Sequence, residues 1–210
     1  MGRPRIIEHD GDVAEGAAWL AASDPALARA LADCGQLPLR RRGDGFEALL
    51  GAIVSQQVSV AAAGAIWRRL AHAGLTDPDA VLAAGDGDLR GAGLSRQKAR
   101  YARALAEARI DYARLRDAPT EEVVATLTEV PGIGVWTAEI YAMFSLGHAD
   151  VFAPGDLALQ EGARMVLSLP ERPRERELRA LAERWSPWRS VAARLLWAYY
   201  ARQKRREGIG

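Results

Sequence analysis

The feature that most constrains the fold of this sequence is a Pro131-Gly132-Ile133-Gly134 turn between two apolar, periodic stretches. Glycine reaches backbone conformations that other residues avoid, and it leaves amide groups uncovered by side chains. The flanking periodicity predicts a helix on each side, and the second helix adds its own unpaired amides and positive dipole end. Such a hairpin is a suitable receptor for a phosphate oxygen.

The rest of the chain favours an all-α fold of roughly ten to twelve helices. No segment alternates apolar and polar residues with a period of two, so no strand is predicted. The glycine-rich stretch 85–93 is predicted to be a loop with a brief helical turn. One helix face has the spacing of a buried stripe: Phe46, Leu49, Leu50, Ile53 and Val54. Predicted helices cover approximately residues 12–22, 25–34, 59–73, 78–84 and 174–184, in addition to the one that carries this stripe. Further helices are expected to begin after Ser95, at Pro119–Thr120, after Gly134 (to about Leu146), after Asp156 (to about Leu167) and after Ser190 (past Tyr200).

Composition narrows the class of protein. The chain has 210 residues, enough for one domain or two closely packed lobes, and its 49% apolar share argues against disorder. The formal net charge is +1, so a nucleic-acid partner has to meet a local basic patch. The single Cys34 excludes an internal disulfide and a cysteine-based zinc or iron–sulfur site. Without a signal peptide or an apolar span of ~20 residues, we expect a cytoplasmic protein with no membrane partner.

Two polar stretches have open interpretations. Arg40–Arg42 can contact phosphates or form a solvated basic loop. Gln56 and Gln57 follow the apolar stripe in Ser55-Gln56-Gln57-Val58-Ser59. They can project outward from a turn, or they can simply end a helix.

Asp156 has two compatible interpretations. It follows Pro154-Gly155 and precedes an amphipathic helix, which is typical of an N-cap, and capping alone accounts for it. However, the amide donors of a helix start also keep a carboxylate ionised. A rigid, ionised carboxylate is what a developing oxocarbenium cation requires.

The chain contains six tryptophans, and two of them bear on a site. Trp136 lies close to the stripe of Ile140 and Phe144, so burial is a serious alternative to a binding role. Trp197 points away from the apolar face of the last helix, so it either packs on a second layer or lines a cleft. The three histidines share no ligand spacing, and neither a phosphate-binding loop nor a nucleophile elbow is present.

The hairpin Val130–Ala138 together with Asp156 resembles the helix-hairpin-helix–GPD superfamily of DNA glycosylases, and within it the 3-methyladenine DNA glycosylase II family. A lone Pro-Gly-x-Gly is weak evidence, whereas five collinear matches with a spaced aspartate are specific. The resemblance covers about residues 20–200. The other matching stretches are Phe46–Arg69, Gly93-Leu-Ser-Arg-Gln-Lys98, and Trp185-Ser-Pro-Trp-Arg-Ser190 with Trp197.

The resemblance implies a two-lobed helical fold with the active site in the interlobe cleft, as a single module over residues 1–210. One lobe would span about residues 46–146, including the hairpin at 121–146. The other would combine about residues 1–45 with 150–210. Longer members carry an N-terminal β-rich domain, for which this chain has no room.

The resemblance also implies roles for individual residues. Asp156 matches the catalytic aspartate, and Gln57, beside Gln56, matches the side chain that fills the gap left by the flipped base. The base pocket would comprise Trp136, Tyr141 and Trp197. The phosphate contacts would be made by Gly132, Gly134 and Thr137, and the backbone carbonyls that hold Na⁺ or K⁺ would be those of Thr128, Val130 and Ile133.

The activity implied is hydrolysis of the N-glycosidic bond of alkylated purines, of the 3-methyladenine and 7-methylguanine type, in double-stranded DNA. Bifunctional members carry a lysine where this chain has Trp136, and an indole forms no Schiff base. We therefore expect a monofunctional, monomeric enzyme, nucleoid-associated in a bacterial cell. It would require no cofactor and hold no iron–sulfur cluster.

Two alternatives stay open. Where some members carry an aromatic residue, this chain has Ile140 beside Tyr141, which leaves the preferred lesion undecided. One alternative substrate is therefore a deaminated or oxidised purine. A protein that binds DNA lesions without catalysis is the other alternative, and the presence of Asp156 argues against it.

Overall fold

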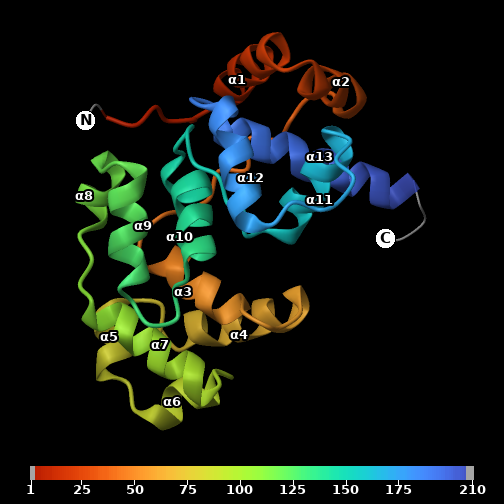
Figure 1. Ribbon diagram of the computed structural model, residues 1–210. Coiled ribbons are helices and arrows are strands. Elements are labelled where there is room, and N and C mark those ends of the chain that lie inside the picture. The colour runs from red at the N-terminus through yellow and green to blue at the C-terminus, as the bar shows by residue number, and fades with distance from the viewer. Residues whose placement is uncertain (1–2, 207–210) are drawn as a thin grey trace. The chain divides into compact units, whose positions relative to one another are not determined.

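The computed structural model describes residues 3–206, and this part of the chain consists of helices and loops without a strand (Figure 1). The all-helical prediction is therefore confirmed. Within the described range no helix is long and apolar enough to cross a membrane. The α-helices are α1 Asp10–Ser23, α2 Pro25–Cys34, α3 Phe46–Ser55, α4 Val60–His72, α5 Pro78–Ala83, α6 Asp86–Gly91, α7 Arg96–Glu107, α8 Tyr112–Asp117, α9 Thr120–Thr128, α10 Val135–Tyr141, α11 Leu157–Val166, α12 Glu175–Ala182 and α13 Arg189–Arg206.

The chain divides into two compact units. The continuous unit runs from Arg42 to Tyr141, and the discontinuous unit combines the chain up to Arg41 with the chain from Ala142 onward. The lobes predicted from the sequence have their boundaries near residues 45 and 146.

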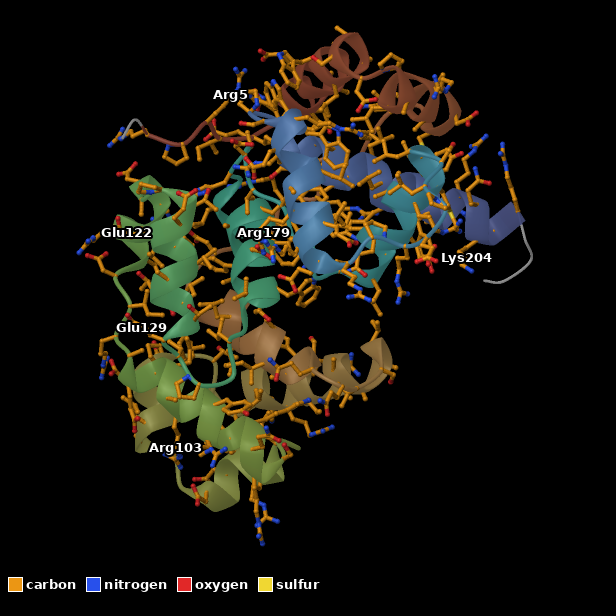
Figure 2. The ribbon with its side chains drawn as sticks, viewed as in Figure 1. Arg5, Arg103, Glu122, Glu129, Arg179 and Lys204 are labelled. Atoms are coloured by element: carbon orange, nitrogen blue, oxygen red, sulfur yellow. The ribbon has the colours of Figure 1, made fainter. Side chains whose placement is uncertain are left out.

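The continuous unit is built around α3, whose predicted stripe is buried and packs against α7 and α4. Ser59 and Ser95 cap α4 and α7 by accepting hydrogen bonds from backbone amides, as serine does at a helix start. Arg103 on α7 donates to the carbonyl oxygens of Val81 and Ala84, at 3.4 and 2.7 Å, and so fixes α7 to the end of α5 (Figure 2).

The discontinuous unit is built around α13, which packs against α11, α2 and α1. Gly162 on α11 allows the closest approach, because a Cβ atom there would lie 2.6 Å from the carbonyl oxygen of Leu196 on α13. Gly16 on α1 has the same function against the ring of Trp188. Glycines at these two contacts therefore allow α11 and α1 to pack closely against α13 and the residue before it.

The structure corrects the sequence prediction in three places. Residues 112–117 form α8, which the sequence analysis did not predict, with Asp111 accepting a hydrogen bond from the amide of Arg114 at 3.0 Å. The brief helical turn expected in the glycine-rich stretch is the six-residue helix α6. The helix after the hairpin continues to Leu146, but its last five residues, Ala142–Leu146, form a π-helix. The described range thus holds thirteen α-helices, more than expected.

Candidate functional site

Asp156 is the N-cap residue of α11, as its Pro-Gly context predicts. Its Oδ1 atom accepts hydrogen bonds from the backbone amides of Ala158 and Leu159, at 2.9 and 3.0 Å. The same atom accepts a third hydrogen bond, at 3.1 Å, from Nε1 of Trp197 on α13. The carboxylate is half-buried and held in one orientation by two elements.

Two hydrogen bonds hold the turn that carries Asp156. The buried side chain of Gln160 donates to the carbonyl oxygen of Pro154 at 2.8 Å. The amide of Asp156 donates to the carbonyl oxygen of Ala153 at 3.0 Å. These two hydrogen bonds connect the turn that carries Asp156 to the first turn of α11 and to Ala153.

The start of α13 holds the segment that leads into this turn. Arg189 donates from Nε to Oδ1 of Asp150 at 2.7 Å and from Nη2 to Oδ2 at 3.1 Å, which is the two-pronged geometry of strong arginine–carboxylate pairs. Ser190 donates to the carbonyl oxygen of Val151 at 3.1 Å, and its amide donates to that of Ala149 at 2.9 Å. The Trp-Arg-Ser stretch thus positions the chain that precedes Asp156.

Trp197 is half-buried, and its ring lies against Phe144 with a centroid distance of 5.7 Å and an interplanar angle of 33°. Of the two interpretations left open by the sequence, the structure supports contact with a second layer. That layer is the π-helix Ala142–Leu146. Phe144 was not among the predicted site residues, although the helical stripe it shares with Trp136 was visible in the sequence.

The predicted hairpin is formed by α9, the turn 129–134 and α10. Gly132 has a φ of +95°, and a Cβ atom at this position would lie 2.4 Å from the ring of Tyr101. Only glycine satisfies both conditions. Gly134 is exposed and has no neighbour within 4 Å of such a Cβ atom, so its backbone is open to a ligand. Thr137 is half-buried in the first turn of α10.

Two of the carbonyl groups predicted to hold a cation come from this turn, and the third ends α9. The carbonyl oxygen of Val130 accepts a hydrogen bond from the amide of Ile133 at 3.0 Å. A carbonyl oxygen has two lone pairs, so a hydrogen bond leaves it able to coordinate a cation. Thr128 directs its hydroxyl to the carbonyl oxygen of Val124 at 2.8 Å. In residues 3–206 no group of three or more His, Cys, Asp or Glu side chains is arranged to hold a metal.

Gln56 and Gln57 differ in what they contact. Gln56 Nε2 donates to the carbonyl oxygen of Gly132 at 2.8 Å and so links the end of α3 to the hairpin. Gln57 is exposed in a backbone conformation with a φ of +55°, which is uncommon for a residue with a side chain. The neighbouring Val60 is 91% exposed. The segment from Gln57 to the first residue of α4 therefore exposes the polar side chain of Gln57 and the apolar side chain of Val60, and this exposed segment is called the tip. The hydrogen bond of Gln56 links the tip to the hairpin.

The predicted pocket residues are in three different situations. Trp136 is 48% exposed, so the burial suggested by its helical stripe does not occur. Tyr141 is 4% exposed, and its hydroxyl accepts a hydrogen bond from the amide of Gly45 at 2.8 Å. Burial raises the pKa of Tyr141 to about 12. Trp197 is the one in contact with Asp156.

A family model described as "HhH-GPD superfamily base excision DNA repair protein" matches residues 50–187 of this chain. The chain is 31% identical over 164 residues to DNA-3-methyladenine glycosylase 1 of Schizosaccharomyces pombe, covering 72% of this chain and 71% of that protein. It is 31% identical over 168 residues to DNA-3-methyladenine glycosylase 2 of Escherichia coli, covering 73% of this chain and 57% of that protein. This chain therefore belongs to the HhH-GPD superfamily of base excision DNA repair proteins.

Two solved structures resemble most of the chain. A DNA-3-methyladenine glycosidase from Bacillus halodurans is 33% identical with a TM-score of 0.82, covering 89% of each chain. The S. pombe 3-methyladenine DNA glycosylase in complex with abasic DNA is 28% identical with a TM-score of 0.74, covering 87% of this chain and 95% of that one.

Proposed function

We propose that this protein is a DNA glycosylase that hydrolyses the N-glycosidic bond of alkylated purines in double-stranded DNA, the first step of base excision repair. Family membership supports the repair role, and the named activity of the relatives supports the alkylpurine substrate. The observation that carries the proposal is Asp156, held by two amides and an indole at the start of α11.

The chemistry requires the target nucleotide to leave the duplex, because its glycosidic carbon is inaccessible in a stacked pair. As the base departs, the sugar acquires oxocarbenium character, and an ionised carboxylate stabilises that charge. Asp156 would supply this carboxylate and help to orient the attacking water. Its three donors reduce the reorganisation needed during the reaction, because the carboxylate is already in place.

The hairpin would bind the DNA backbone, and the tip at Gln57 would separate the bases next to the flipped nucleotide. The open backbone at Gly134 and the amides of the first turn of α10 suit a phosphate oxygen. The exposed side chain of Gln57 would occupy the space left by the flipped base. Gln56 would keep these two elements in register through its hydrogen bond to Gly132.

The base pocket suits a cationic purine. An indole face attracts a cation by about 0.5–2 kcal/mol, and an N-alkylated purine carries a positive charge. Trp136, which is 48% exposed, would supply such a face. Since Trp136 has no amine, the reaction would end at the abasic site without strand cleavage.

No cofactor is needed for this hydrolysis, and the single Cys34 cannot ligate an iron–sulfur cluster. We propose that the carbonyls of Thr128, Val130 and Ile133 hold Na⁺ or K⁺, which would add positive charge beneath the phosphate site. One chain would suffice, because Asp156, Trp197 and the hairpin come from the same chain. Chromosomal DNA as substrate favours a nucleoid location.

The test is a panel of duplexes that carry 7-methylguanine, 3-methyladenine, hypoxanthine or an oxidised guanine at one position. Released base and alkali-labile sites are measured after incubation with the protein. We expect base release from the two alkylated duplexes and strand breaks only after alkali. Binding without release from any duplex would overturn the enzymatic proposal, and release only from hypoxanthine or oxidised guanine would redirect the substrate. Strand breaks before alkali would contradict the role given to Trp136.

A further inference from the structure

Arg194 is a buried arginine in the discontinuous unit. Only 1% of its surface is exposed. Arg194 lies on α13, four residues after Ser190 and three residues before Trp197, so these three residues share one face of the helix. Ser190 holds the chain before the site turn, and Trp197 holds Asp156.

The hydrogen bonds of Arg194 go to backbone carbonyl oxygens. Nη1 donates to Ser190 at 2.9 Å, while Nε and Nη2 donate to Leu39 at 3.2 and 3.1 Å. Burial, followed by the charges of Arg40 and Arg41, lowers the pKa of Arg194 to about 10. A buried cation whose bonds go to carbonyl groups is costly, and an apolar side chain of similar volume would often stabilise the fold better. A specific contact of the guanidinium is therefore needed to explain its presence.

That contact is with an aromatic ring. The guanidinium carbon of Arg194 lies 4.9 Å from the centroid of Phe144. Phe144 in turn lies against Trp197, whose Nε1 donates to Asp156. A continuous series of contacts thus runs from the buried cation to the candidate catalytic carboxylate, entirely within the discontinuous unit.

The physical effect of this series is orientation. Phe144 belongs to the π-helix Ala142–Leu146, a wider turn that occurs often at functional sites. A planar guanidinium over a ring restricts how that ring can tilt, and the hydrogen bonds of Arg194 hold the guanidinium itself. The ring of Phe144 lies against that of Trp197, so its position limits the orientations that the indole can adopt. The indole N–H has to point at Oδ1 for the carboxylate to keep its orientation.

We propose that Arg194 is a positioning residue for the reaction, which acts through Phe144 and Trp197 to hold the Asp156 carboxylate. The proposal rests on the proposed glycosylase function for its kinetic consequence. The expected effect of Arg194 on the orientation of Trp197 does not depend on that function.

The test compares Arg194→Met and Arg194→Lys with a matched control, Arg103→Met. Arg103 also donates to two backbone carbonyls, but it belongs to the continuous unit. Three quantities are measured: the single-turnover rate of 7-methylguanine release, the Kd for a duplex with an abasic analogue, and the ¹⁹F resonance of Trp197 in protein labelled with 5-fluorotryptophan. A Trp197→Phe sample assigns that resonance.

For Arg194→Met we expect the rate to fall about tenfold, as for loss of one oriented hydrogen bond, while Kd changes less than about twofold. The Trp197 resonance should shift or broaden. Arg194→Lys should recover part of the rate, because it keeps the charge over Phe144 and loses the planar fork. Arg103→Met should change neither the rate nor the resonance.

An unchanged rate or an unchanged Trp197 resonance in folded Arg194→Met would overturn the proposal. If that variant does not fold, Arg194→Lys and Phe144→Leu decide the question, since both should release base more slowly than the wild type and show an altered Trp197 resonance. If the wild type releases no base from any duplex, the proposed function fails, and the Trp197 resonance still decides whether Arg194 orients the indole.

Discussion

At the residue scale, Asp156 has a close counterpart in the same unit. Asp24 also caps a helix, accepting from the amides of Ala26 and Leu27, and its Oδ2 accepts from Nε1 of Trp185 at 3.3 Å. Trp185 is 1% exposed, whereas Trp197 is half-buried. An aspartate N-cap with an indole donor is thus not by itself a catalytic arrangement. We propose that Asp156, and not Asp24, is catalytic, because the stretch Pro154-Gly155-Asp156 resembles the corresponding motif of the family.

This pair of arrangements gives a controlled prediction. Trp197→Phe keeps an aromatic ring against Phe144 and removes the donor to Asp156, so we expect the single-turnover rate of base release to fall about tenfold. Trp185→Phe removes the equivalent donor to Asp24. It should lower the midpoint of thermal unfolding by a few degrees and leave the rate unchanged at a temperature where the protein is folded. Equal effects of the two substitutions on the rate would contradict the assignment.

At the element scale, the sequence predicted what local patterns determine. The cap at Asp156 and the stripe of α3 follow from spacing and residue type. The π-helix and the positive φ of Gln57 could not be predicted, because both depend on the packing of distant segments. The same holds for the contact of Trp197 with Asp156 and for the burial of Tyr141, whose hydroxyl accepts a hydrogen bond from the amide of Gly45.

The hairpin offers a matched pair of glycine substitutions. Gly132→Ala should destabilise the fold by about 2 kcal/mol or more, because alanine is strained at a φ of +95° and its Cβ would contact Tyr101. Gly134→Ala meets no neighbour and should leave the free energy of unfolding almost unchanged. It should still weaken binding to an abasic-analogue duplex, since a methyl group would cover the backbone that receives the phosphate. Chemical denaturation and fluorescence anisotropy measure the two effects. Unchanged DNA affinity in Gly134→Ala would show that the turn is not the phosphate site.

At the scale of the whole molecule, buried phenols determine how stability responds to alkaline pH. Burial raises the pKa of Tyr141 to about 12 and also raises the pKa of Tyr112, whose buried hydroxyl has no hydrogen bond. Above pH 10 the unfolded chain loses the phenolic protons while the native protein keeps them. The native state then binds more protons, so the free energy of unfolding decreases as the pH rises from about 10 to about 12.

Tyr141→Phe isolates one of these phenols. The variant should be less stable at pH 7 by about 1 kcal/mol, because the amide of Gly45 loses its acceptor. It should also lose less stability than the wild type between pH 10 and pH 12, by about 1–3 kcal/mol. Denaturant unfolding at several pH values measures both quantities. Parallel curves for the two proteins would contradict the raised pKa.

In the proposed function, Asp156 both caps α11 and stabilises the cationic sugar. Asp156→Asn tests the second of these roles most directly, with Asp77→Asn as the control, because Asp77 also caps a helix through two amides. Asparagine caps helices as well as aspartate does, so both variants should keep the wild-type thermal midpoint. We predict that Asp156→Asn lowers the single-turnover rate of 7-methylguanine release by about 100-fold or more, while Asp77→Asn stays within about twofold of the wild type. Release by Asp156→Asn at the wild-type rate would contradict this account.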